Sequence, residues 1–569
     1  MQVSIEWLHD YIDFKETAEE LADKYTMAGV PVENVVRADS GLDKVVTGRI
    51  EKLEPNPDSD HLLVCQMNVG QKELVTIQTG ADNVHEGDIV PVALVGAHLP
   101  NGLKIAKGKL RGIVSNGMLC SAGELKLDES KLTEEQKNGI YILPPDTPVG
   151  IPASKALGLD GVVLEFELTA NRGDCFSVLG LVREAAVLTG GEAKFPEIRV
   201  EEDASVRASD LIEIGIAAPE LCSRFSARVL QNVKIAPSPA WMAKRLEDAG
   251  IRAINNVVDV TNFVMLELGQ PMHAYDWAQI AGKKLTARLA AKGEELHTLD
   301  DSSRRAKGTE LVIADAEKAA GLAGVMGGLE SEVTDATQTV VLEAAAFNGA
   351  SIRRTSRALG LRSEASGRFE RGVDVAHTVR ALDRAAQLLQ QMGACTIAAG
   401  VVDVYPTPKA PVEVTFTAAA VNARLGTEIE GAEMKRILEK LGFAVCEESS
   451  SYIACVPSWR SDVTLMEDIS EEVARIHGYD KIAATRPRGE AVQGRQSERL
   501  AFIGRIKEIL TGLGMTETVS FSFTHPSMFD KMQVPQASVL RRAVPIMNPL
   551  TDEYPLVRTT LLSNLLENA

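Results

Sequence analysis

The sequence predicts a multidomain protein of the α+β class, and three observations support this prediction. A chain of 569 residues is too long to fold around one hydrophobic core, and its length suggests roughly three to five domains. The apolar content of 45% and the charged content of 24% are those of an ordinary folded protein. Along the chain, stretches of short β-like runs alternate with stretches of helical pattern, which indicates several separate units.

The two segments 1–40 and 151–195 are expected to form an amino-terminal α/β domain together. Apolar residues recur at helical spacing at the start of the first segment, and Thr17 begins a second predicted helix. The second segment contains a helical pattern that ends at the glycine pair beginning with Gly190.

Residues 41–150 change to short β-like runs separated by turns. Five or so short strands in about a hundred residues suggest a small barrel. A basic run near the end of this segment is unusual in so acidic a chain: Lys104, Lys107, Lys109 and Arg111. These four side chains are candidates for contacts with phosphates.

Residues 200–400 form a mixed α/β region rich in glycine and alanine. The block from Asn255 to Asp276 weaves polar residues through apolar ones, and we interpret it as a helix followed by a turn that presents His273. On chemistry alone, a satisfied core histidine and a ligand-binding histidine are equally compatible with this block. The glycine cluster at 321–328 lacks the Lys-Ser/Thr of a P-loop, so we interpret it as a strand-to-turn segment and reject nucleotide binding there.

Residues 410–485 predict a compact α/β unit with an acidic cluster near its last helix. The cluster contains Asp462, Asp468, Glu471 and Glu472. Asp468 and Glu472 lie four residues apart, on one side of a helix, where like charges repel unless a cation or a basic group neutralises them. Carboxylate oxygens suit Mg²⁺. The spacing alone favours a simpler interpretation, in which acidic residues stabilise a helix N-terminus.

The last segment, residues 490–569, contains an amphipathic helix predicted over 499–513. The chain stops in the middle of a helical pattern, which suggests a partial chain.

The bulk composition restricts location and partners. A net charge of −19 argues against binding nucleic acid by overall attraction, so an RNA-binding face would have to be local. The seven cysteines are scattered and form no Cys-x-x-Cys pair, which favours a reducing compartment and argues against a disulfide framework or a structural zinc site. The amino terminus shows no secretory signal, and no stretch approaches the ~20 apolar residues of a membrane span. We expect a cytoplasmic protein with no membrane partner.

Five motifs occur in a fixed order along the chain: 168–175 (LTANRGDC), 255–276 (NNVVDVTNFVMLELGQPMHAYD), 321–328 (GLAGVMGG), 341–347 (VLEAAAF) and 360–374 (GLRSEASGRFERGVD). Together they resemble the bacterial phenylalanyl-tRNA synthetase β subunit family, over essentially the whole chain. No single motif decides the resemblance; the ordered set does.

The resemblance implies a fold for each unit. Residues 41–150 are similar to an OB-fold tRNA-binding domain, residues 200–400 to a B3/B4-like α/β editing domain, and residues 410–485 to a small B5 domain. Residues 490–569 are similar to the start of a class II synthetase-like domain with an antiparallel sheet, which keeps the shape of a catalytic domain without its chemistry. The rest of that domain and the anticodon-binding domain are expected to be absent from this chain.

The resemblance also implies a site that hydrolyses tRNA mischarged with tyrosine. A pocket that accepts phenylalanine cannot strongly reject an isostere with one added hydroxyl, so a second site must recognise the hydroxyl itself. The residues that match this site are Glu343, His273, Thr261, Asn262, Ala323 and Gly324. Glu343 would accept a hydrogen bond from the tyrosine hydroxyl, the next three would line the pocket, and the last two would let the backbone approach the substrate. Water activation by His273 and by the substrate's own hydroxyl fit these residues equally.

Finally, the resemblance implies partners and cofactors. The four acids of the 462–472 cluster match the residues that bind magnesium at the contact with an α subunit, in a complex of two α and two β chains. ATP would be used by that complex and not bound by a site of this chain. tRNA is an expected partner and DNA is not. Two alternatives remain: a free-standing hydrolase of mischarged tRNA, which would need no acidic cluster, and a tRNA-binding scaffold with a vestigial pocket.

Overall fold

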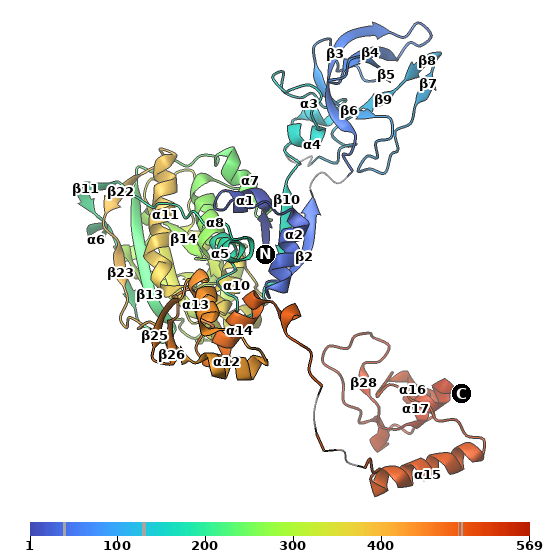
Figure 1. Ribbon diagram of the computed structural model, residues 1–569, viewed down its shortest axis with the longest axis vertical. Coiled ribbons are helices and arrows are strands. Elements are labelled where there is room, and N and C mark those ends of the chain that lie inside the picture. Colours follow the sequence, from blue (N-terminus) through green and yellow to red (C-terminus); the bar gives the residue numbers. More distant parts are fainter. Residues whose placement is uncertain (38–40, 128–131, 487–488, 491–492) are drawn as a thin grey trace. The chain divides into compact units, whose positions relative to one another are not determined.

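The computed structural model describes residues 1–37, 41–127, 132–486, 489–490 and 493–569. These residues form two compact units, Met1–Ala483 and Ala484–Ala569 (Figure 1). Both units mix helices and strands. The predicted boundary at residue 40 lies outside the described residues. None of the described helices is both long and apolar enough to cross a membrane.

The first sheet of the larger unit joins the two amino-terminal segments. It is antiparallel with the order β1-β10-β2. Its strands and the helices near it are β1 (Gln2–Ser4), α1 (Ile5–His9), α2 (Ala18–Met27), β2 (Val32–Arg37), β10 (Val162–Phe166) and α5 (Val178–Thr189). Thr17 caps α2 through a capping box with Glu20, and Gly190 ends α5 in the left-handed conformation. Both helix limits agree with the sequence prediction.

Residues 45–152 form a nearly closed barrel. Its sheet has the order β5-β4-β3-β6-β9, and the backbone N–H of Asn116 donates to Thr76 O at 2.9 Å beside the β5 and β9 ends of this sheet. The elements are β3 (Val45–Pro55), β4 (Leu63–Asn68), β5 (Val75–Thr79), β6 (Ile89–Leu94), β7 (Gly108–Leu110), β8 (Ile113–Ser115), β9 (Gly117–Leu119), α3 (Glu134–Lys137) and α4 (Ala153–Ala156). Alternating apolar residues such as Cys65, Met67 and Ile77 fill its interior.

Two sheets make up the central part of the larger unit. The first has the order β11-β22-β13-β21-β14, with β23 also paired to β13; the second has the order β12-β15-β18-β19-β20. The strands of the two sheets are β11 (Glu202–Arg207), β12 (Glu213–Ile216), β13 (Cys222–Gln231), β14 (Met272–Asp276), β15 (Lys284–Leu289), β18 (Leu311–Ala314), β19 (Ala319–Leu322), β20 (Met326–Gly327), β21 (Val340–Phe347), β22 (Thr396–Ala399) and β23 (Val402–Val404). Strands β16 (Glu295–Thr298) and β17 (Ser302–Arg305) pair with each other in a separate two-stranded sheet. The helices are α6 (Ala208–Leu211), α7 (Ala240–Asp248), α8 (Asn256–Leu268), α9 (Gly349–Leu359), α10 (Glu364–Arg371) and α11 (Thr378–Gln391).

Strand β21 shows how the β11-β22-β13-β21-β14 sheet is covered on both faces. All eight of its residues are buried. Val340, Leu342 and Ala344 belong to a core shared with helices α8 and α11, which lie beside β13 and β14 in Figure 1. Val341 and Ala345 point the opposite way, into a core shared with the second sheet. The alternation follows from the two-residue period of a strand.

Residues 413–477 form a further antiparallel sheet, with the order β24-β26-β25, together with three helices. Its elements are β24 (Glu413–Phe416), α12 (Ala418–Leu425), α13 (Gly431–Lys440), β25 (Ala444–Glu448), β26 (Ser451–Cys455) and α14 (Met466–His477). The segment is of the α/β type, as predicted for 410–485, and it contains one helix and one strand more than the sequence pattern indicated.

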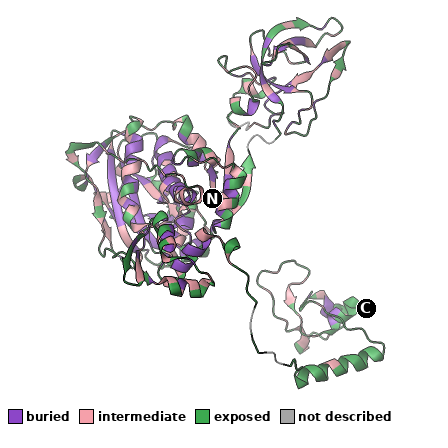
Figure 2. Ribbon diagram, in the orientation of Figure 1, coloured by how far each residue is buried: buried purple, intermediate pink, exposed green. Residues whose placement is uncertain are grey.

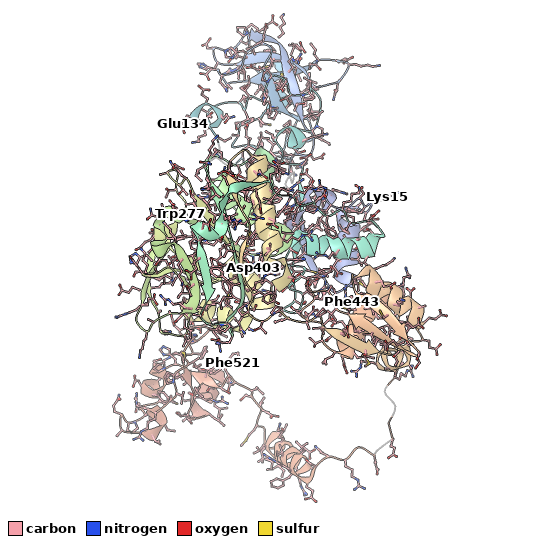
Figure 3. All side chains as sticks on the ribbon, turned by 90° about the vertical axis from the view of Figure 1, so that its left-hand side faces the viewer. Lys15, Glu134, Trp277, Asp403, Phe443 and Phe521 are labelled. Atoms are coloured by element: carbon pink, nitrogen blue, oxygen red, sulfur yellow. The ribbon has the colours of Figure 1, made fainter. Side chains whose placement is uncertain are left out.

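The smaller unit contains little sheet. Its elements are α15 (Glu498–Gly512), β27 (Phe523–Thr524), α16 (Ser527–Lys531), β28 (Leu556–Val557) and α17 (Leu562–Asn568). Helix α15 agrees within a residue with the predicted helix, and Figure 2 shows it exposed along nearly its whole length. Phe521, labelled in Figure 3, belongs to the same unit and is 74% exposed.

Candidate functional site

Strands β14 and β21 place three polar side chains on one face of the β11-β22-β13-β21-β14 sheet. The strands are antiparallel, and His273 lies directly opposite Glu343. Tyr275 lies two residues after His273 and therefore points to the same face. Its hydroxyl donates a hydrogen bond of 2.5 Å to Glu343 Oε2, and its ring meets the His273 ring edge-on at 4.5 Å. This face is turned toward the β12-β15-β18-β19-β20 sheet.

A cavity opens between this face and the turn that joins β19 to β20. It has a volume of about 90 Å³ and is partly open to solvent, and His273, Tyr275, Glu343 and the 321–327 segment line it. The rings of Phe347 and Phe369, 4.9 Å apart, add an apolar wall. The cavity therefore offers one aromatic wall and one carboxyl group, the combination that suits a small ring with a polar substituent.

Two glycines in and after this turn lie too close to neighbouring rings to be replaced by a residue with a side chain. Gly324 has a φ of +66°, and a β-carbon there would stand 2.8 Å from Phe369 Cδ2. A β-carbon on Gly327 would stand 2.3 Å from Cε1 of the His273 ring. Side chains at these two positions would fill the cavity or displace its histidine.

Burial changes the titration of both groups that face each other across the strands. Burial raises the pKa of Glu343 to about 7, although the hydrogen bond from Tyr275 acts in the opposite direction. Burial lowers the pKa of His273 to about 4. At neutral pH the imidazole is therefore uncharged, and the carboxyl group is close to half protonated. His273 Nε2 is buried and forms no hydrogen bond with any described residue, so it is available to a ligand or a water.

Four of the six residues predicted for the site line this cavity: His273, Glu343, Ala323 and Gly324. Thr261 and Asn262 lie on helix α8 and are not among its lining residues; the Thr261 hydroxyl donates to Val258 O within the helix. Tyr275 lines the cavity as well, although the sequence interpretation did not name it. The turn expected at Gly269 is present, and the strand that follows it places Tyr275 on the same face as His273.

The acidic cluster near α14 is engaged mostly by arginines. The Arg460 guanidinium binds Asp462 at 2.8 Å and Glu472 at 2.6 Å, and Arg475 binds Glu472 at 2.6 Å. Both oxygens of Glu472 each accept from two guanidinium groups, which leaves this carboxylate poorly suited to a metal ion. Asp468 accepts from the backbone N–H groups of residues 464 and 465, as a helix-capping acid does.

Glu471 is the member of the cluster that stays exposed. Within the part of the chain that the structure describes, the three-residue set with metal-ligand spacing lies elsewhere, at Asp174, Cys175 and Glu184. There too an arginine neutralises the acids, because Arg172 binds both carboxylates. The assignment of magnesium to the four acids stays a prediction.

The basic run of the barrel lies on its surface. Lys104, Lys107, Lys109 and Arg111 are all exposed, and Arg111 stands with φ +42° between β7 and β8. No contact of these side chains with RNA is part of the structure, so their assignment to RNA binding also stays a prediction.

Comparison with known domain families accounts for most of the chain. Residues 45–152 match a putative tRNA binding domain, residues 221–394 a B3/4 domain, residues 414–479 a tRNA synthetase B5 domain, and residues 482–569 the phenylalanyl tRNA synthetase beta chain CLM domain. This set of domains, with a cavity in the B3/4 part, defines a subunit of an aminoacyl-tRNA synthetase.

Two relatives specify the family. The phenylalanine–tRNA ligase beta subunit of Moorella thermoacetica is 45% identical over 569 residues, which cover 100% of this chain and 70% of that protein. The beta subunit of Clostridium tetani is 42% identical over 567 residues, which cover 100% of this chain and 71% of that protein. The chain belongs to the family of phenylalanine–tRNA ligase beta subunits.

A solved structure gives a weaker similarity. An N-terminal fragment of the phenylalanyl-tRNA synthetase beta-subunit from Pyrococcus horikoshii is 14% identical and covers 56% of this chain and 88% of its own, with a TM-score of 0.31.

Proposed function

We propose that the cavity between His273, Tyr275 and Glu343 is an editing site that hydrolyses tyrosine esterified to phenylalanine-specific tRNA. The observation that carries this proposal is a buried carboxyl group facing a cavity of small-ring size, directly across the strands from a neutral histidine. A core position gains nothing from an ionisable group whose charged form is disfavoured, whereas a selective site does.

Glu343 would distinguish tyrosine from phenylalanine by its free oxygen. Tyr275 donates to Oε2, and no described residue is hydrogen-bonded to Oε1. A phenol hydroxyl in the cavity can therefore donate to that oxygen, whereas a phenyl ring would leave it desolvated and unpaired. In a buried site this difference supplies strong discrimination.

His273 would position the ester and the attacking water through its unpaired Nε2. With a pKa of about 4, the imidazole is a weak base at neutral pH and is poorly suited to take the proton from the attacking water. We therefore assign it a hydrogen-bonding role. This favours the substrate's own hydroxyl as the group that assists the water.

The whole protein would act with a partner subunit. Helix α15 exposes apolar residues that water does not favour, including Leu500, Phe502 and Ile509. This favours a ligase subunit over a free-standing hydrolase. We propose an α subunit as the partner in a tetramer of two α and two β chains, with the catalytic-like segment and an OB-fold barrel on this chain, in the cytoplasm.

Magnesium and ATP are proposed for the complex. ATP would be used at the partner's site. Of the four acids predicted for Mg²⁺, Glu471 is exposed, whereas Glu472 is committed to Arg460 and Arg475. The residues present thus fit an ion only at the exposed side of the cluster.

A deacylation assay tests the editing proposal. The assembled ligase should hydrolyse tyrosine-charged tRNA and spare phenylalanine-charged tRNA. Glu343→Ala should reduce this preference by at least tenfold, because a lost hydrogen bond to a charged group is worth about 1.5–3 kcal/mol. Glu213→Ala, at the exposed first position of strand β12, should leave it unchanged. An unaltered preference in the Glu343 variant would refute the role given to this residue.

A further inference from the structure

Helix α9 carries a strongly basic face. Arg353, Arg354 and Arg357 are exposed and lie on one side of the helix, because their spacing of three and four residues matches its period. Arg362, in the turn before α10, is exposed as well. These four residues are called the arginine surface.

The arginine surface lies in a stretch of the chain without acidic residues. No acidic residue occurs between Glu343 and Glu364, although the whole chain has 79 acidic and 60 basic residues. In the described part of the chain, no carboxylate forms an ion pair with any of the four guanidinium groups. Other arginines of the same unit, such as Arg368 and Arg475, are buried and form ion pairs. Unpaired like charges on one helix face repel each other, so an external anion would stabilise this surface.

The opposite side of the same helix pair forms part of the candidate site. Ala365 and Phe369 of α10 line the cavity. Ile352 of α9 packs at its edge, with Cδ1 3.2 Å from the position of a β-carbon on Gly324. An α-helix with its side chains is about 10–12 Å across, so the arginine surface lies one helix width from the cavity wall.

We propose that the arginine surface binds the phosphodiester backbone of the RNA whose esterified amino acid occupies the cavity. This inference rests on the proposed function, since it names the part of the substrate that remains outside the cavity. Guanidinium groups bind phosphates in a bidentate manner and stay charged at all physiological pH values. Contacts of this kind add affinity and position the strand without reading its sequence.

Salt-dependent binding of uncharged phenylalanine-specific tRNA tests the surface directly. The assembled ligase is compared with Arg353→Gln/Arg357→Gln and with Arg252→Gln, an exposed arginine between α7 and α8. In the double variant, the slope of the logarithm of the binding constant against the logarithm of the salt concentration should become less negative by about 1.4 to 1.8. Binding should weaken roughly tenfold. Arg252→Gln should match the wild type. An unchanged slope in the double variant, or an equal loss in Arg252→Gln, overturns the proposal.

Kinetics with tyrosine-charged tRNA separate binding from chemistry. The double variant should raise KM roughly tenfold and leave kcat within about twofold, because the arginines touch the strand and not the ester. A lower kcat at constant KM contradicts this role and indicates damage to the cavity. If the wild type hydrolyses no charged tRNA, the proposed editing function fails. The binding measurement needs no hydrolysis, so it still tests whether the arginine surface binds RNA.

Discussion

Glu343 is held where its ionised form is costly, and this gives a prediction at the scale of one residue. Because its pKa rises from 4.5 to about 7 on folding, the folded state binds the proton more tightly, and stability is lost as pH rises through this interval. Glu343→Gln cannot ionise. Between pH 5 and pH 8 the variant should gain about 2 kcal/mol of unfolding free energy relative to wild type. Denaturant unfolding at the two pH values measures this gain.

Tyr275→Phe provides a second arm of the same experiment. The hydrogen bond from Tyr275 lowers the pKa of Glu343, so its removal should make the loss of stability with pH steeper. A difference between Glu343→Gln and wild type that is the same at pH 5 and pH 8 would contradict the shifted titration.

The sequence predicts His273 and Glu343 as residues of one site, although it does not show how they meet. They are 70 positions apart, and only the pairing of β14 with β21 puts them opposite each other. Tyr275 escaped prediction because the turn expected after Gly269 continues at once into a strand, whose period determines the face of each side chain. Thr261 lies on α8, where its hydroxyl donates to Val258 O of the same helix, so its place in the site stays a prediction.

At the scale of an element, the turn between β19 and β20 is tested by two alanine substitutions. Gly324 and Gly393 have nearly the same φ, +66° and +65°, but only Gly324 has neighbours within reach of a β-carbon. Both substitutions should cost about 1–2 kcal/mol of stability from the left-handed backbone. Gly324→Ala should also crowd Phe369 and lower kcat/KM for tyrosine-charged tRNA at least tenfold. Equal deacylation by the two variants would show that this turn does not shape the cavity.

Helix and strand limits were predictable where local chemistry decides them. Thr17 with its capping box and Gly190 in the left-handed conformation are such positions. The acidic residues near α14 show the limit of this approach. Their spacing on one side of a helix does not reveal that Arg460 and Arg475 fill the space between them. Because Arg460 stands 12 positions before Glu472, helical periodicity gives no indication of the pair.

At the scale of the whole molecule, a buried network of ion pairs connects distant parts of the larger unit. Arg475 of α14 binds Glu184 of α5 at 2.6 Å, and Arg172 binds the same carboxylate at 2.6 Å. Through Glu472 the network continues to Arg460. All these side chains are 4% exposed or less. The network joins the amino-terminal segments to residues 460–475, a connection that no local pattern indicates.

Glu472 is the position where a structural and a metal-binding role give different results. Burial alone would raise its pKa, but Arg475 and Arg460 hold the pKa well below its usual range, so its charge contributes stability at neutral pH that is lost on acidification. Glu472→Gln should lower the unfolding free energy by about 3–5 kcal/mol, because it leaves buried guanidinium charge uncompensated. Glu433→Gln, which breaks the exposed pair with Arg436, should cost less than about 1 kcal/mol.

Measuring both variants with and without a chelator in the assembled ligase separates the two roles. If Glu472 serves the arginine network, removing magnesium changes the unfolding free energy of wild type and of Glu472→Gln by the same amount. The reason is that the arginines, and not an ion, compensate the carboxylate. If the residue instead holds an ion that stabilises the fold, the chelator lowers the unfolding free energy of the wild type toward that of the variant. The unfolding free energy of the variant then stays unchanged. We expect equal shifts, because each oxygen of Glu472 already accepts two charged hydrogen bonds and a cation would have to displace an arginine that is itself buried.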